Sequence, residues 1–189
     1  VDAVVLDIGS VMTRCGFAGE ARPRAVVPHG RPASLVRPPA AAALHDVVGA
    51  HAFGPWWSLD GVGDADAAAL EAVVTHHLAA IYTQYLLIDP SQRPVVLVEP
   101  ALMPVPVKTM LVRVLLTVFR VPAVTPVPAA LMGLLTTGRP EGLVVDCGYL
   151  EATIVPIVDH RALMAHTVSV PCAGATVTRQ LQREVMRSG

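Results

Sequence analysis

Residues 4–9 of the chain read VVLDIG, and residues 143–148 read LVVDCG. Each stretch is a β-branched apolar run that ends in Asp-x-Gly, and its two aspartates, Asp7 and Asp146, are 139 residues apart. A short apolar run followed by a glycine turn predicts a buried strand that ends at that turn. Two such runs at this spacing indicate that one structural unit occurs twice along the chain.

The segments between and after the two runs complete the unit. The predicted strands are residues 3–8, 12–18, 24–28, 94–99 and 123–127. The predicted helices run from Asp64 to Tyr85, over 107–119 and over 128–137. The first helix has one apolar stripe, at Leu70, Val73, Val74, His77, Leu78, Ile81 and Tyr85. After the second run we expect strands at 143–148, 152–158 and 162–168 and a helix at 176–187. The order βββαβα followed by βββα predicts an α/β fold whose second copy stops early.

The stretch 29–63 breaks this regular pattern. It is rich in proline, glycine and alanine, shows no helical or strand period, and has the pair Trp56-Trp57 as its one bulky feature. We therefore expect an irregular insertion there. The predicted domain division is a first lobe at 1–139, which contains this insertion, and the start of a second lobe at 140–189.

Composition excludes several classes of function. The 14 basic and 15 acidic residues give a net charge of −1. The chain therefore has no strong electrostatic field that would attract a nucleic acid or an anionic membrane. No apolar run approaches the ~18 residues of a membrane span. Three cysteines without close spacing argue against a disulfide framework or a thiolate zinc site, and we read them as small buried residues in a reducing compartment. The seven histidines show no ligand spacing.

The two Asp-x-Gly turns are the motifs that could carry chemistry. Glycine lets backbone N–H groups approach phosphate oxygens, and an aspartate at a strand end can hold a hydrated Mg²⁺. Two such turns that face each other could clamp the phosphates of a nucleotide. The alternative is that both are ordinary structural turns.

The residues that follow the first turn resemble a known family. DIGSVMTRCGFAGEARPRAVVP at 7–28 resembles the opening of actin and the actin-related proteins. A later strand of that family is similar to PVVLVEP at 94–100. Its second phosphate loop and the strand after it are similar to GLVVDCG at 142–148 and TIVPI at 153–157. The resemblance implies the actin fold, a ribonuclease H-like fold shared with heat-shock chaperones and sugar kinases. It covers roughly the first half of that fold, so we expect a fragment.

The resemblance also implies a nucleotide site. It would bind ATP or ADP with Mg²⁺ held by Asp7 and Asp146, and the expected nucleotide-binding residues are Asp7, Gly9, Ser10, Arg14, Asp146 and Gly148. Several positions depart from the family pattern. Val11 replaces a second glycine, Arg14 replaces a lysine, and Tyr149-Leu150 replace a second acid and glycine. Ala129 falls where the family has the glutamine that positions water. Since phosphoryl transfer needs charge neutralisation and a positioned water, we expect no hydrolysis.

Two stretches narrow the resemblance within the family. RCGFAGE at 14–20 and VDCGYLE at 145–151 look most like the actin-related proteins at the pointed end of dynactin. That implies a non-catalytic cytoplasmic and cytoskeletal subunit that caps an actin-like filament. Its partners would be the filament subunits and pointed-end accessory subunits of dynactin, with an indirect link to dynein-driven transport. Segment 29–63 would then block subunit addition, with Trp56 and Trp57 as partner anchors, unless the indoles simply pack their own subdomain. The alternative function is a working ATPase, either a filament-forming actin or a chromatin-remodelling relative.

Overall fold

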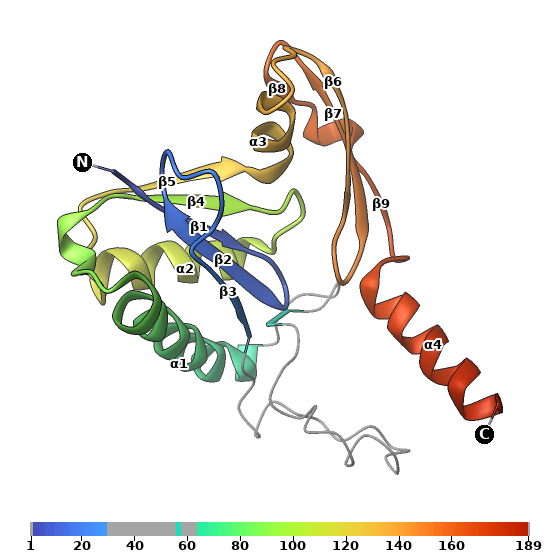
Figure 1. Ribbon diagram of the computed structural model, residues 1–189, viewed down its shortest axis with the longest axis horizontal. Coiled ribbons are helices and arrows are strands. Elements are labelled where there is room, and N and C mark those ends of the chain that lie inside the picture. Colours follow the sequence, from blue (N-terminus) through green and yellow to red (C-terminus); the bar gives the residue numbers. More distant parts are fainter. Residues whose placement is uncertain (1, 30–55, 58–63, 189) are drawn as a thin grey trace. The chain divides into compact units, whose positions relative to one another are not determined.

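A computed structural model describes residues 2–29, 56–57 and 64–188 (Figure 1). The rest of the predicted insertion, 30–55 and 58–63, lies outside the described residues. The chain forms two compact units. The first is Val1–Val98 with Met103–Pro126, and the second is Glu99–Leu102 with Val127–Gly189. The expected lobe division after residue 139 stays a prediction.

A five-stranded sheet carries the first unit, in the order β3-β2-β1-β4-β5. The strands are β1 (Val4–Ile8), β2 (Met12–Phe17), β3 (Ala25–Pro28), β4 (Val95–Glu99) and β5 (Val124–Pro128). β1 pairs antiparallel with β2 and parallel with β4, which makes the sheet mixed. Val4, Leu6 and Ile8 are fully buried while Val5 and Asp7 between them are half-buried, so alternate residues of β1 lie on opposite faces.

Two helices pack on the buried face of this sheet (Figure 1). They are α1 (Asp64–Ala80), which continues as the π-helical turn η4 (Ile81–Leu86), and α2 (Val105–Thr117). A 3₁₀ turn, η5 (Pro90–Gln92), leads into β4. The apolar stripe expected over 107–119 is confirmed in part, since Val107, Met110, Leu111, Val114 and Leu115 are all buried. Its last two members differ, because α2 ends at Thr117: Val118 is 53% exposed and Phe119 is half-buried. No helix in the described part of the chain is long and apolar enough to cross a membrane.

The π-helical turn changes the predicted stripe of the first helix. Leu70, Val74, His77, Leu78 and Ile81 are buried as expected, but Tyr85 is 43% exposed. The next buried residue after Ile81 on this side is Leu86, five positions later, and Tyr82 also enters the core. Hydrogen bonds in a π-helix join residues five positions apart, so the i+4 spacing that predicted Tyr85 fails at this turn.

The second unit is built on β7 (Ala152–Val158), which pairs antiparallel with β6 (Gly142–Cys147), β8 (Arg161–Ala162) and β9 (Val168–Val170). The single strand expected at 162–168 is wrong. β8 and β9 are separated by the 3₁₀ turn η6 (Met164–His166). Helix α3 (Ala129–Leu135) supplies Ala130 and Leu134 to a small core with Val155 and Ile157. Helix α4 (Gly174–Ser188) follows β9.

The two predicted copies share one hairpin register. Asp7 lies opposite Arg14 in the first hairpin, and Asp146 lies opposite Thr153, 139 residues later in each case. Leu6 and Cys15, also a pair, are buried under the helices of the first unit. Their counterparts are Val145 and Ile154, and Val145 is 59% exposed, since α3 packs on the opposite face of its hairpin.

Other apolar and cysteine side chains of the second unit are also exposed. The predicted stripe of the last helix, at Val177, Leu181 and Val185, is more than 60% exposed. Cys15 is buried as expected, but Cys147 and Cys172 are exposed free thiols, so the prediction for these two is wrong. Both lie in the unit whose hairpin and last helix have an apolar face uncovered by the described residues.

Candidate functional site

The first Asp-x-Gly turn is closed by a short backbone hydrogen bond. Gly9 N–H donates to the carbonyl oxygen of Met12 at 3.0 Å. A Cβ at Gly9 would lie 3.2 Å from the same oxygen, closer than most real Cβ contacts, and this explains the glycine. Val11 adopts no left-handed backbone in this turn, so its side chain is accommodated without strain there.

The second turn repeats this geometry. Gly148 N–H donates to the carbonyl oxygen of Glu151 at 3.0 Å, and a Cβ at Gly148 would also lie 3.2 Å from that oxygen. The carbonyl groups of Gly148 and Tyr149 accept hydrogen bonds from Gly174 N–H (3.1 Å) and Ala175 N–H (2.8 Å), at the start of α4. Both turns therefore have the same closing hydrogen bond and the same close approach at their glycine, and phosphate binding by them stays a prediction.

The acid and the cation predicted to serve the nucleotide are paired with each other. Arg14 Nη1 lies 3.1 Å from Asp7 Oδ2, across the β1–β2 register. The Arg14 side chain is 53% exposed, and exposed pairs of this kind stabilise a fold by only about 0–1 kcal/mol. A phosphate could therefore replace Asp7 as the partner of the Arg14 guanidinium with little loss of folding stability.

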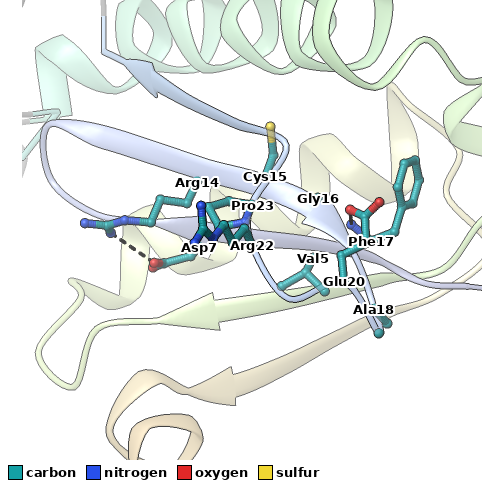
Figure 2. A pocket seen from close by; sticks show the side chains of 11 residues that line it. Val5, Asp7, Arg14, Cys15, Gly16, Phe17, Ala18, Glu20, Arg22 and Pro23 are labelled. Atoms are coloured by element: carbon teal, nitrogen blue, oxygen red, sulfur yellow. Dashed lines mark hydrogen bonds and ion pairs between the residues drawn. The ribbon is translucent and has the colours of Figure 1, made fainter.

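A hollow of about 290 Å³ lies on the Asp7 face of the first sheet (Figure 2). Asp7 and Arg14 stand at one end, and Phe17, Ala18 and Glu20 at the other. Of the predicted nucleotide residues in this unit, Gly9 and Ser10 do not line the hollow. The hollow is thus separate from the backbone cradle of the turn.

The remaining predicted site residues belong to the second unit. Asp146 is exposed at the end of β6, Ala129 is the first residue of α3, and Tyr149 is half-buried against α4. No group of three acidic, cysteine or histidine side chains able to hold a metal ion occurs within residues 2–29, 56–57 and 64–188. Joint binding of Mg²⁺ by Asp7 and Asp146, which lie in different units, stays a prediction, as does their approach to one nucleotide.

Comparison with known families agrees with these two loops. The actin family profile matches residues 1–189, the whole chain. The chain belongs to the actin family. Its fold is accordingly the actin-type α/β fold, as the resemblance of its sequence to that family implied.

Individual relatives match over part of their length. Centractin of Saccharomyces cerevisiae is 33% identical over 97 residues, which are 51% of this chain and 25% of centractin. Actin-related protein 4 of Arabidopsis thaliana is 32% identical over 104 residues, 55% of this chain and 24% of that protein. The aligned part thus spans about a quarter of the length of either relative.

Behind the first loop of this actin-family chain lies a buried polar cluster. His29 and Thr13 are 0% exposed and His77 is 7% exposed. Thr13 Oγ1 lies 2.8 Å from His29 Nε2 and 3.1 Å from His77 Nε2. The Trp56 ring stacks on the His29 ring with centroids 3.5 Å apart, and its edge meets the His77 ring at 4.9 Å.

This cluster is uncharged at neutral pH. Burial lowers the pKa of His29 to about 3, with the neighbouring His77 adding repulsion. Burial likewise lowers the pKa of His77 to about 4, with His76 contributing. Two neutral imidazoles can each donate one hydrogen bond and accept another, which suits a buried network.

The cluster bears on the two tryptophans predicted as partner anchors. Trp56 and Trp57 are 5% and 8% exposed, and Trp56 is packed within its own unit. This favours the alternative that the indoles pack their own subdomain, and partner binding by them stays a prediction. The sequence pattern gave no role to His29 or Thr13. The one signal in the sequence was His77, a histidine within an otherwise apolar helical stripe.

Proposed function

We propose that this chain is part of a non-catalytic actin-related subunit at the pointed end of dynactin. It would cap the actin-like filament there, bind the accessory subunits and so support dynein-driven transport along microtubules in the cytoplasm. The observation that carries the proposal is a contrast within the site. Both loops keep the same closing hydrogen bond, at Gly9 and at Gly148, while side chains that hydrolysis needs are replaced.

The replaced side chains affect separate steps of phosphoryl transfer. At Ala129 a methyl group stands where the family places a water-positioning amide, and a methyl group orients no water. Tyr149 and Leu150 stand where the second loop would have an acid and a glycine, which removes a group from the cation shell. We infer that a bound nucleotide serves as a structural ligand, held by the backbone of the loops and by Asp7, Arg14 and Asp146.

The assignment to the pointed end rests on the two stretches that resemble that branch. In the first, Glu20 accepts a hydrogen bond from Phe17 N–H at 3.0 Å and pairs with Arg24 at 2.7 Å. The Arg24 guanidinium lies 4.5 Å from the centre of the Phe17 ring. In the second, Glu151 closes the loop with its carbonyl and accepts from Ser169 with its carboxylate. These acids thus have structural roles beside the loops, in the two stretches on which the resemblance to that branch rests.

The test is affinity purification of the full-length protein from cells, with its partners identified and quantified. The proposal predicts recovery of filament and pointed-end subunits of dynactin in fixed ratio to the bait. Recovery with nuclear assemblies, or as homopolymer alone, would contradict it. A second assay measures phosphate release from Mg·ATP on the same preparation, where the proposal predicts none above the protein-free rate.

The second candidate is a nucleotide-hydrolysing member of the family. It is retained because actin-related protein 4 and centractin match this chain at nearly equal identity, so overall similarity does not separate the branches. Sustained phosphate release together with polymerisation would favour this candidate.

A further inference from the structure

We propose that His29 is the positioning residue of the first loop, oriented by a hydrogen-bond relay from His77 through Thr13. His29 Nδ1 lies 3.1 Å from the carbonyl oxygen of Ser10, and the backbone N–H of His29 donates to the carbonyl of Val11 at 2.8 Å. The backbone N–H of Trp56 also donates to the Ser10 carbonyl, at 3.0 Å. The Ser10 carbonyl is therefore held by the His29 ring and the Trp56 backbone, and the next carbonyl, of Val11, by the backbone of His29.

The direction of every proton in the relay follows from the groups that it joins. The Ser10 carbonyl can only accept, so His29 Nδ1 carries the proton and His29 Nε2 is an acceptor. Thr13 O–H must then donate to His29 Nε2 at 2.8 Å. The Thr13 oxygen also accepts a hydrogen bond from His77 Nε2–H, at 3.1 Å. One tautomer of each ring satisfies all three contacts.

Fixing the carbonyls also fixes the amides. In a trans peptide the C=O and N–H groups point in opposite directions, and the described residues contain no cis peptide. Because the carbonyls of Ser10 and Val11 point toward the ring and the backbone of His29, the N–H groups of Val11 and Met12 point away from that residue. Consecutive amides aimed to one side make an anion-binding concavity. The His29 ring, with the Trp56 N–H, thus orients the Ser10–Val11 peptide and the N–H donor that it presents to a phosphate.

The second loop shows the same anchoring achieved by other means. The counterpart of Ser10 in the repeat is Tyr149, and its carbonyl accepts from Ala175 N–H at the start of α4. The second loop is therefore held by the first turn of a helix, and the first loop by an imidazole together with the backbone N–H of Trp56. This parallel between the two copies indicates that anchoring of the loop carbonyl is a requirement of the loop, and that His29 meets it in the first copy.

The test uses two variants of the full-length protein that each keep one half of the imidazole. His29→Asn keeps a donor at the position of Nδ1, facing Ser10, while His29→Gln keeps a polar group at the position of Nε2, facing Thr13. Both lose the ring stacked on Trp56. The readouts are the amide chemical shifts of Val11 and Met12 and the dissociation constant of Mg·ATP. Long-range proton–nitrogen spectra of the wild type report the two tautomers.

If His29 positions the loop, the smaller asparagine variant should perform better than the larger glutamine variant, which is the reverse of the order expected from side-chain size alone. His29→Asn should keep near-native amide shifts and bind Mg·ATP within about threefold of wild type, while His29→Gln should shift both amides and bind roughly tenfold more weakly, as loss of one hydrogen bond implies. Equal losses, or a smaller loss for the bulkier glutamine, would overturn the assignment, and so would the opposite tautomer at His29. The ligand readout rests on the proposed nucleotide site. If the wild type binds no Mg·ATP, that site fails, and the amide shifts still decide the role of His29.

Discussion

Arg14 and Asp7 form an ion pair across β1 and β2, with Nη1 and Oδ2 3.1 Å apart. The two residues are direct partners in the strand register, so the hairpin itself brings them together. In the second hairpin the partner of Asp146 is Thr153, which has no charge. The two acids of the expected nucleotide site therefore differ in one respect, since the register partner of the first is a cation and that of the second is neutral.

This difference predicts that Arg14 matters more for ligand binding than for folding. Arg14→Gln should change the free energy of unfolding by less than about 1 kcal/mol, because the pair is exposed. It should weaken Mg·ATP binding roughly tenfold or more, because a charge-assisted hydrogen bond to phosphate is lost. Isothermal titration calorimetry and urea unfolding measure the two quantities. Arg14→Lys is the matched control, and it should retain most of the affinity. Unchanged affinity in Arg14→Gln would place the nucleotide elsewhere.

The shared loop geometry predicts equal sensitivity at two glycines. Gly9→Ala and Gly148→Ala each place a Cβ 3.2 Å from a backbone carbonyl oxygen that cannot move freely. Each should destabilise its own unit by about 1–2 kcal/mol in urea unfolding. Gly133→Ala is the control, since its Cβ meets only Val144 Cγ1 at 4.0 Å and a helical alanine should stabilise by roughly 0.5–1 kcal/mol. A neutral result at only one of the two loops would show that the copies are not equivalent.

The buried histidines predict a loss of stability on mild acidification. Their pKa values fall from an ordinary 6.5 to about 3 for His29 and about 4 for His77 in the fold. The unfolded chain thus binds protons first, so stability is complete above pH 6.5 and falls from there to about pH 4 for His77 and about pH 3 for His29. The loss should reach roughly 3 kcal/mol for each ring by pH 4. Urea unfolding followed by tryptophan fluorescence at several pH values measures it.

Single-residue variants separate this effect from general acid sensitivity. His29→Asn should remove about half of the dependence on pH, since His77 remains, while replacement of the exposed neighbour in His76→Gln should leave it nearly unchanged. An identical pH profile in wild type and His29→Asn would show that the acid sensitivity does not come from His29.

The core of the first unit predicts that one hydroxyl can be removed without harm. Tyr82 is 1% exposed, burial raises the pKa of its phenol, and its hydroxyl meets no hydrogen-bond partner within the described residues. Tyr82→Phe should therefore be neutral or stabilising by up to about 1 kcal/mol. Tyr82→Leu should be clearly destabilising, because it also loses the ring contact with Phe119 at 5.5 Å. Thermal unfolding of both variants checks the order, and a large loss in Tyr82→Phe would reveal a partner for the hydroxyl.

Local patterns predicted much of this fold. Each Asp-x-Gly turn follows a strand whose apolar residues can be read directly, so β1 and β6 were predicted from the runs that end at Asp7 and Asp146. The shared hairpin register was not predicted and comes from the structure. The apolar stripe within α2 could also be predicted from the sequence, since its helical repeat is regular. The π-helical turn was not, because Tyr85 has the right spacing for an α-helix and only packing reveals that Leu86 takes its place.

The cluster behind the first loop was beyond sequence reasoning for a different reason. His29, Trp56 and His77 are far apart in the chain, and two of them lie in a stretch without periodicity. Their role arises from contacts with the Ser10 carbonyl and with Thr13, which no short-range pattern encodes. The candidate site was thus predicted where backbone turns define it, and missed where tertiary contacts do.

The most direct test of the central claim is a single-turnover measurement on the full-length protein. ATP labelled at the γ-phosphate is bound with Mg²⁺, free nucleotide is removed, and the bound fraction is analysed over time beside a filament-forming actin. We predict that the protein retains intact ATP throughout. Conversion of bound ATP to ADP and phosphate at the rate of the actin control would contradict the claim, because Ala129 and Tyr149 would then not have disabled the site.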